Sequence, residues 1–200
     1  MGLCIARSLL DKGIQVTLID PLPPGPGPRA SSDHIRLIRT PYGHQVGYQR
    51  MVHEAFGAWD RLWAELGQVH YEQTGVLLIG DEEAAWVQAS LNNLGPHEAR
   101  LVEDPAGLVP GLELKRGQSA WLVEEAGLLF ADEILIAVAA SVQEVDFIQA
   151  SVAGINADRG DVRLDTGETL HADRVIVSSG AWPWPDGSPR ASRMPSRQTA

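Results

Sequence analysis

Apolar residues recur at helical spacing in several stretches of the chain. The clearest stretch covers residues 48–66, where apolar side chains follow one another three or four positions apart, as on the buried face of an α-helix. Similar spacing predicts helices over 2–12 and 82–94, and the apolar composition of 132–142 predicts a fourth. Gly13 is the residue type that commonly ends a helix, so the first helix is expected to stop there.

Runs of β-branched and other apolar residues predict strands between these helices. Residues 14–19 form such a run, which ends in Asp20 and a proline-rich stretch over 21–28, so a buried strand is expected to lead into a loop. Further strands are predicted over 69–72, 76–79, 120–123, 127–130, 161–164, 169–171 and 174–177. Two hairpins are expected, one through Thr74-Gly75 and one through the turn at 165–168. Helices that alternate with strands and hairpins indicate an α/β fold.

The composition narrows the classes of protein that the chain can represent. Its 200 residues are 44% apolar and carry a formal charge of -10, with a pI near 5.0. This apolar content can fill a core, and the net negative charge argues against a nucleic acid as partner. The single cysteine favours the cytoplasm, and neither a signal peptide nor a membrane span is expected. The six histidines show no metal-ligand spacing, so no metal is assigned.

The first twenty residues carry a weak signal of dinucleotide binding. In a βαβ unit of that kind, a glycine opens the helix against a pyrophosphate, and an acidic residue at the end of the next strand accepts hydrogen bonds from ribose hydroxyls. Gly2 and Asp20 occupy these two places, while the first strand and the first two glycines of a G-x-G-x-x-G motif would lie before Met1. The alternative is that Gly2 is incidental and that Asp20 caps a turn before Pro21.

Four further segments carry a family resemblance. They are SSDHIRLIRTPYG at 31–43, TGVL at 74–77, GLLF at 127–130 and ADRVIVSSGAW at 172–182. In this order and at roughly this spacing they resemble the sarcosine oxidase and D-amino-acid oxidase superfamily of FAD-dependent enzymes. The resemblance covers nearly all of residues 2–182 and corresponds to the N-terminal half of such an enzyme.

The resemblance implies roles for polar residues of the first segment. Ser31, Ser32 and Arg36 match residues beside the isoalloxazine ring, where the charge of Arg36 would stabilise the anionic reduced ring. Arg39 matches the residue that binds the substrate carboxylate through parallel hydrogen bonds. The two arginines face the same side only if the segment is helical or turned, since residues three apart in a strand point to opposite faces. The alternative is that both are solvated surface charges.

The resemblance also implies cofactor contacts toward the C-terminus. Val152 matches the residue whose backbone meets the adenine edge, although a strand valine can equally be an ordinary core residue. Ser179, Gly180 and Ala181 match a second turn against the flavin, where small side chains let the backbone approach, and Trp182 is grouped with them. A turn that contains glycine would look the same without a ligand.

The expected architecture is part of a Rossmann-like FAD-binding domain interleaved with part of an antiparallel substrate-binding sheet. Residues 1–43 and 131–182 are assigned to the cofactor domain, and residues 44–130 to the substrate domain. The tail at 183–200, rich in prolines and basic residues, is expected to lack packed structure.

The resemblance implies an FAD-dependent oxidoreductase that oxidises the carbon–nitrogen bond of a secondary amine or an amino acid by hydride transfer to flavin. His34 and Ser32 depart from the residues that relatives of sarcosine oxidase often have, so the resemblance does not point to sarcosine itself as the substrate. Two alternatives stay open. One is a catalytically inactive, truncated remnant, and the other is an NAD(P)-dependent dehydrogenase, which shares the helix and strand signal.

Overall fold

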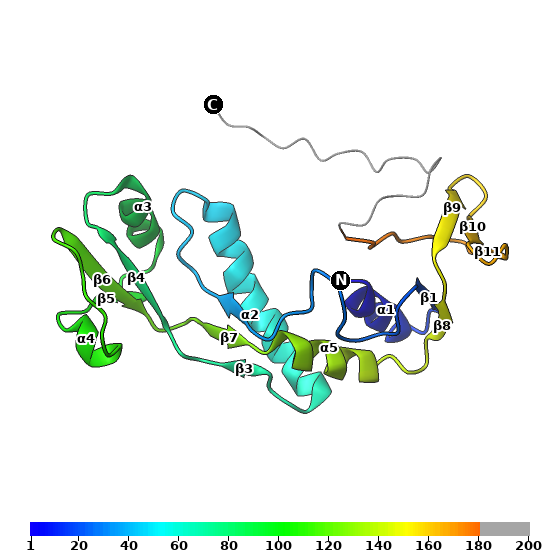
Figure 1. The fold of residues 1–200 in the computed structure, drawn as a ribbon, viewed down its shortest axis with the longest axis horizontal. Coiled ribbons are helices and arrows are strands. Elements are labelled where there is room, and N and C mark those ends of the chain that lie inside the picture. Colours follow the sequence, from blue (N-terminus) through cyan, green and yellow to red (C-terminus); the bar gives the residue numbers. More distant parts are fainter. Residues whose placement is uncertain (181–200) are drawn as a thin grey trace. The chain divides into compact units, whose positions relative to one another are not determined.

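The computed structural model describes residues 1–180, which form two compact units (Figure 1). Of the described residues, unit 1 consists of 1–32 and 135–180, and unit 2 consists of 33–134. None of the helices in the described part of the chain is both long and apolar enough to span a bilayer. The division into cofactor and substrate domains stays a prediction, and the tail at 183–200 lies outside the described residues.

Unit 1 contains a parallel pair of strands that follows the first helix. The helix α1 (Gly2–Leu10) is the one predicted from the spacing of apolar residues. The strand β1 (Thr17–Asp20) pairs in parallel with β8 (Asp146–Gln149), so that Asp20 lies opposite Gln149. A parallel pair requires a long connection between its strands, and here that connection includes all of unit 2.

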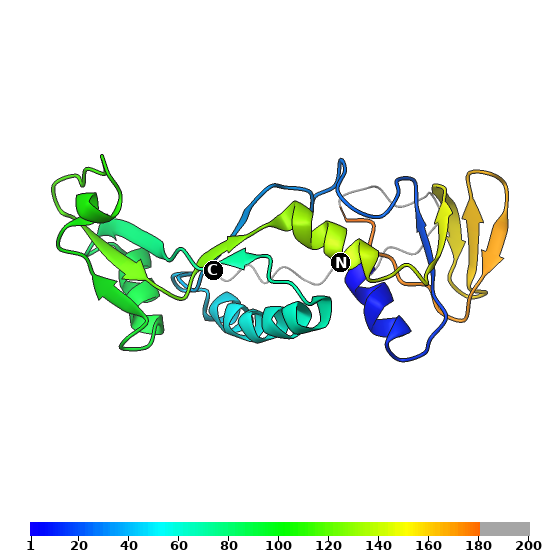
Figure 2. The same ribbon diagram turned by 90° about the horizontal axis from the view of Figure 1, so that it is seen from below.

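Unit 1 also contains an antiparallel sheet in the order β11-β10-β9, whose yellow to orange strands lie side by side in Figure 2. Its strands are β9 (Val152–Asn156), β10 (Asp161–Leu164) and β11 (Thr169–His171). The last two form the predicted hairpin around 165–168. One core serves both sheets, because Ile19 and Ile148 of the parallel pair pack against the buried residues Ala150, Val162 and Leu164. The predicted helix at 132–142 is also present, as α5 (Ala131–Ala140), which begins in unit 2 and ends in unit 1.

The strand predicted at 174–177 is wrong. These residues have no strand partner among the described residues. Val175 packs against the core, but Ile176 and Val177 are 56% and 38% exposed. An apolar run becomes a strand only when a neighbouring strand binds its backbone N–H and C=O groups, and no described strand does so here.

Unit 2 is built around the long helix α2 (Val46–Leu66), which packs on a sheet ordered β2-β7-β3. The strands of this antiparallel sheet are β2 (Arg36–Ile38), β7 (Gly127–Leu129) and β3 (Tyr71–Glu72). The core consists of buried Ile38, Trp63 and Leu129 with Val52, Ala55, Phe56, Trp59, Leu62 and Leu66 packed against them. The predicted apolar face of the helix is therefore the face that packs.

A second antiparallel sheet of unit 2 has the order β4-β6-β5. Its strands are β4 (Val76–Asp81), β6 (Gln118–Val123) and β5 (Ala99–Leu101). The helix α3 (Ala85–Asn93), predicted at 82–94, follows β4, and the short helix α4 (Pro105–Leu108) follows β5. The buried residues Leu78, Val87 and Trp121 form the core between α3 and this sheet.

The hairpin predicted through Thr74-Gly75 is wrong. β3 and β4 do not pair with each other but with β7 and β6, so residues 71–81 continue in one direction along residues 118–129 (Figure 1). The Gly75 N–H donates to the Ala126 carbonyl at 2.9 Å, which ties the linker to the neighbouring connection instead of reversing the chain. The strong two-residue hairpin turns contain Asn-Gly or Asp-Gly, and Thr-Gly supplies only the glycine.

Candidate functional site

A hollow of about 440 Å³ lies at the carboxyl ends of the parallel strands β1 and β8 in unit 1. Residues at these strand ends and in the turn between β10 and β11 line it: Pro21, Gln149, Ala150, Ser151, Asp165 and Thr166. Ligands of parallel sheets bind at this edge, because the loops there can be shaped around a ligand without disturbing the strands. The hollow is therefore the candidate dinucleotide site of unit 1.

Backbone and side-chain hydrogen bonds fix the walls of the hollow. The Ala150 N–H donates to the Asp20 carbonyl at 3.3 Å, which extends the pairing of β1 and β8 to the loop. Across the hollow, the Ser151 N–H donates to Asp165 Oδ1 at 3.2 Å, and the Asp165 N–H donates to the Ser151 carbonyl at 2.9 Å. The hairpin turn is thus held against the strand ends.

Asp20, the predicted ribose ligand, ends β1 beside this hollow. Its Oδ1 accepts hydrogen bonds from the Leu22 N–H and from Arg29 Nη2, both at 2.9 Å, and its side chain is 40% exposed. Arg29 also donates to the carbonyls of Gly25, Leu22 and Pro23. Arg29 was not singled out from the sequence, where only its place directly after the proline-rich stretch marks it. It holds both the loop and the carboxylate in place.

Val152 and the two predicted serines also belong to unit 1. Val152 begins β9 and packs against the core, so the structure supports its packing role. Ser32 Oγ accepts a hydrogen bond from the Gly27 N–H at 2.8 Å, which closes the proline-rich loop, and Ser31 is exposed. In the loop itself, Ser32 acts as a structural residue.

Gly2 opens α1 next to the predicted second flavin turn. A Cβ atom added at Gly2 would come within 2.7 Å of Ser178 Oγ, so the start of the helix lies against the segment that leads to Ser179 and Gly180. Gly180 has a φ of 66°, a conformation that glycine adopts without strain. The structure therefore brings these predicted residues together, while Ala181 and Trp182 lie outside the described residues.

Arg36 and Arg39 belong to unit 2. Arg36 begins β2, and its Nε lies 3.8 Å from Asp33 Oδ2, whereas Arg39 follows the last residue of that strand. The segment is a strand and not a helix, so helical spacing does not turn both guanidinium groups to one side. The two arginines have different surroundings, which suits different roles.

Arg39 lies against an aromatic pair that was not predicted from the sequence. Its guanidinium carbon is 4.4 Å from the centroid of the Tyr42 ring, and Tyr42 stacks on Tyr48 with centroids 5.7 Å apart. Arg39 Nη1 also donates to the Pro41 carbonyl. Stacking on an aromatic ring fixes the plane of a guanidinium while its edge stays available for hydrogen bonds. The spacing of Arg39 and Tyr42, three residues apart, is the only sign of this contact in the sequence.

Tyr71 in unit 2 has a perturbed pKa with a structural cause. Burial raises the pKa of the Tyr71 phenol, and the negative charge of Glu125 raises it further. Its ring makes an edge contact with Phe56, with centroids 6.2 Å apart. The shift accompanies packing of Tyr71 in the core beside α2, so it does not mark Tyr71 as a proton donor.

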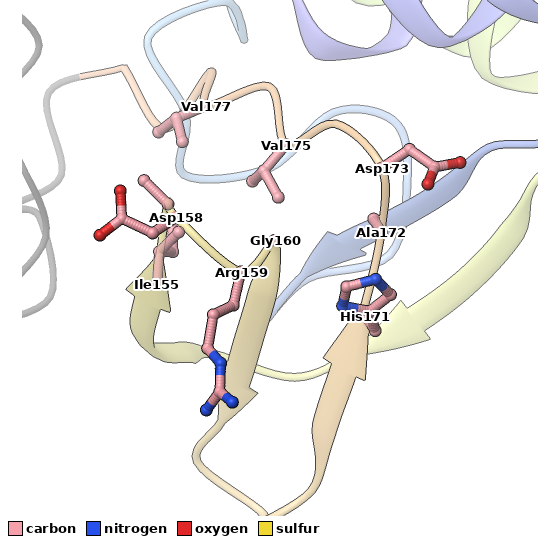
Figure 3. A pocket seen from close by; sticks show the side chains of 10 residues that line it. Ile155, Asp158, Arg159, Gly160, His171, Ala172, Asp173, Val175 and Val177 are labelled. Atoms are coloured by element: carbon pink, nitrogen blue, oxygen red, sulfur yellow. The ribbon is translucent and has the colours of Figure 1, made fainter.

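A second hollow of unit 1, of about 410 Å³, lies between the turn at 157–160 and the segment after β11. Figure 3 shows Val175 and Val177 along this segment and the charged side chains of Asp158 and Arg159 on the turn. His171 lines it as well and is paired with Asp161, with Nδ1 and Oδ1 3.1 Å apart. This hollow does not lie at the carboxyl ends of the parallel strands β1 and β8, so it is not the candidate cofactor site.

Comparison with known proteins connects this chain to an enzyme family. Human peroxisomal sarcosine oxidase is 28% identical over 160 residues, which cover 76% of this chain and 41% of the human protein. Amadoriase I of Aspergillus fumigatus, solved as a mutant, has a TM-score of 0.69 at 22% identity over 90% of this chain and 46% of its own. NikD, an unusual amino acid oxidase essential for nikkomycin biosynthesis, has a TM-score of 0.67 at 19% identity over 84% and 45%.

The solved structures and the family model support different conclusions. The solved structures, at 19% and 22% identity, establish the fold, and the chain spans less than half the length of these relatives. The model of the family called DAO, FAD dependent oxidoreductase, matches residues 1–198. It confirms the resemblance carried by the four segments and the assignment of FAD as the cofactor. Since the match extends over nearly the whole sequence, this chain belongs to the DAO family of FAD-dependent oxidoreductases.

Proposed function

We propose that this chain acts in the FAD-dependent oxidation of the carbon–nitrogen bond of a secondary amine or an amino acid. The observation that carries the proposal is the placement of Asp20 at the carboxyl end of β1, beside the hollow of unit 1. The names of two relatives, a sarcosine oxidase and an amino acid oxidase, support this class of substrate.

The residues of unit 1 fit the adenosine and pyrophosphate parts of FAD. The partly exposed carboxylate of Asp20 is an acceptor suited to ribose hydroxyls. The first N–H groups of α1, which begins at Gly2, suit the negative charge of a pyrophosphate. When bound, the flavin supplies the acceptor for the hydride that leaves the substrate carbon.

Arg39 is proposed to bind the carboxylate of an amino-acid substrate. A guanidinium can donate two parallel hydrogen bonds to a carboxylate, and Tyr42 holds its plane by stacking. A fixed plane reduces the conformational entropy that is lost when the substrate binds. Arg39 would thus orient the substrate, and the charge of Arg36 would favour the anionic form of the reduced ring.

Binding of FAD is the first test. The purified chain, mixed with FAD and separated from free cofactor, should retain a flavin absorbance band. Asp20→Asn should weaken FAD binding about tenfold, because an amide oxygen accepts a weaker hydrogen bond than a carboxylate. Asp146→Asn is the matched control, since Asp146 lies at the opposite end of the same strand pair. No retained flavin at high FAD, or equal loss in both variants, contradicts the proposal.

Turnover is the second test. Secondary amines and amino acids are supplied to the FAD-loaded chain, and hydrogen peroxide release and dye reduction are measured. Arg39→Lys should raise KM about tenfold for substrates with a carboxylate but not for amines without one, because a single ammonium lacks the paired donors. Retained flavin without turnover of any substrate supports the inactive alternative instead.

A further inference from the structure

Three side chains from separate segments of unit 2 converge at its surface. They are His53 on α2, Glu98 just before β5, and Glu125 in the connection between β6 and β7. One ligand atom from each lies within 4.8 Å of the other two. His53 Nε2 is 3.8 Å from Glu98 Oε1. One imidazole nitrogen and two carboxylate oxygens therefore surround a common point.

The backbone on which these side chains stand is held in place. Glu98 Oε2 accepts a hydrogen bond from the Gly95 N–H at 2.6 Å, while Oε1 of the same carboxylate lies toward His53. The connection that carries Glu125 is fixed on both sides, because the Gln73 amide donates to the Glu124 carbonyl at 3.0 Å and Gly75 donates to Ala126. The helix that carries His53 packs into the core through its neighbours on the other face. Only the side-chain tips have to move to bind a ligand.

The charges at this point favour a cation. The carboxylates of Glu98 and Glu125 lie together. Among the described residues, the group paired with Glu98 in this cluster is the imidazole of His53 and not a lysine or arginine. The nearby Arg100 is paired with the other glutamate of the connection, Glu124, at 3.2 Å. A divalent cation would neutralise the repulsion between the two carboxylates.

We propose that His53, Glu98 and Glu125 bind a divalent transition-metal ion of the zinc class. An imidazole ligand selects ions such as Zn²⁺, Co²⁺ and Ni²⁺, whereas Mg²⁺ and Ca²⁺ take oxygen ligands only. Zinc lies about 2.0–2.2 Å from such ligands, so the ligand atoms must approach one another by small rotations of the side chains, of which His53 and Glu125 are exposed. Three protein ligands leave room for water to complete the coordination.

The site would add a connection between parts of unit 2 that are already joined by strands and by the hydrogen bond from the Gln49 amide on α2 to the Asn93 carbonyl on α3 at 2.6 Å. His53 belongs to the helix that packs on β2-β7-β3, and Glu98 precedes β5 of the other sheet. Sequence spacing could not reveal the site, because its ligands are 45 and 27 residues apart along the chain (98 minus 53, and 125 minus 98). The expected result of metal binding is a rise in the unfolding temperature of the chain.

Metal is first removed from the full chain with a chelator. The chain is then titrated with ZnCl2, and binding is measured by isothermal titration calorimetry. One ion per chain should bind with a Kd well below about 1 mM. His53→Ala, Glu98→Gln and Glu125→Gln should each weaken binding about tenfold or more. The exposed residues His44 and Glu113 supply the matched controls, His44→Ala and Glu113→Gln, which should bind as the unaltered chain does. Titration with MgCl2 and CaCl2 should give no comparable binding.

Thermal unfolding gives a second readout that does not depend on FAD. ZnCl2 should raise the Tm of the unaltered chain and of both control variants, but not the Tm of the three ligand variants. The Tm of each ligand variant without metal shows that it is folded. Absence of zinc binding overturns the proposal, as does equal binding by the ligand variants or equal binding of magnesium. These outcomes leave the proposed oxidoreductase function untouched, since they involve other residues and another ligand.

Discussion

The side chain of Arg29 makes four hydrogen bonds, three to carbonyls of the proline-rich loop and one to the carboxylate of Asp20. A guanidinium can satisfy several acceptors at once because its donors form a rigid fork. Prolines have no N–H group and cannot form the usual turn hydrogen bonds themselves. Arg29 thus supplies donors that the residues of this loop lack.

Arg29→Ala should destabilise the chain by about 1 kcal/mol, a value reduced for the partial exposure of Asp20. Arg29→Lys should recover only part of the loss, because an ammonium cannot reach all four acceptors from one position. Urea unfolding followed by circular dichroism measures both. Arg159→Ala, at an exposed position of the same unit, is the control. If Arg29→Ala unfolds at the same urea concentration as Arg159→Ala, the loop does not depend on Arg29.

The place of a candidate residue in the fold was predictable where it depends on local sequence. The position of Asp20 at the end of β1 could be predicted because a carboxylate that follows an apolar run is visible in the sequence itself. Arg29 and the stacking partner Tyr42 could not, because their importance comes from atoms that only the fold brings near. The pairing of His53 with Glu98 is of the same kind.

Among the elements, β3 and β7 approach each other closely at Gly127. A Cβ atom at this position would lie 2.1 Å from the Glu72 carbonyl oxygen, which belongs to the backbone and cannot rotate away. Glycine is required here by space and not by its dihedral freedom. The close approach lets Leu129 reach the core beneath α2.

Gly127→Ala should destabilise unit 2 by about 2 kcal/mol or more, because the two strands must separate to admit the methyl group. Gly47→Ala is a matched control, since Gly47 lies in α2 with open space where its Cβ would stand. That control should be neutral or slightly stabilising, as alanine favours the helix. Both are compared by chemical denaturation, and an equal midpoint for the two variants would refute the steric argument.

Elements defined by local pattern were predictable, and pairings between distant segments were not. The apolar spacing of α2 and the turn between β10 and β11 are encoded in neighbouring residues, and both are present. The pairing of β3 with β7 joins residues more than fifty positions apart, and nothing in the sequence of either strand specifies its partner. For the same reason, the apolar residues at 174–177 gave no sign that this segment would lack a partner strand among the described residues.

At the scale of the whole molecule, unit 2 is one continuous stretch of chain, whereas unit 1 is formed by two separated stretches. Unit 2 has its own cores around Trp63 and around Trp121. A continuous stretch with its own core is expected to fold by itself. Unit 1 needs both of its stretches to form the pair of β1 and β8.

Residues 33–142, which include unit 2 and complete α5, should therefore fold when produced alone. Urea should unfold this piece in one cooperative transition, with coincident curves from tryptophan fluorescence and circular dichroism. Trp63→Ala in the same piece should lower the stability by about 3 kcal/mol or more, as removal of a buried aromatic ring does. A gradual, non-cooperative loss of signal would show that unit 2 depends on unit 1.

The parallel pair joins Thr17 to Asp146, residues 129 positions apart. On the ribosome, the N-terminal segment must wait for its partner until all of the intervening chain has been synthesised. Early collapse of residues 33–134 would shorten the distance that the two ends have to search, since loop closure costs less for a compact insert than for an extended coil. Slow translation of this middle region would lengthen the wait and leave the apolar strand around Leu18 open to aggregation for longer.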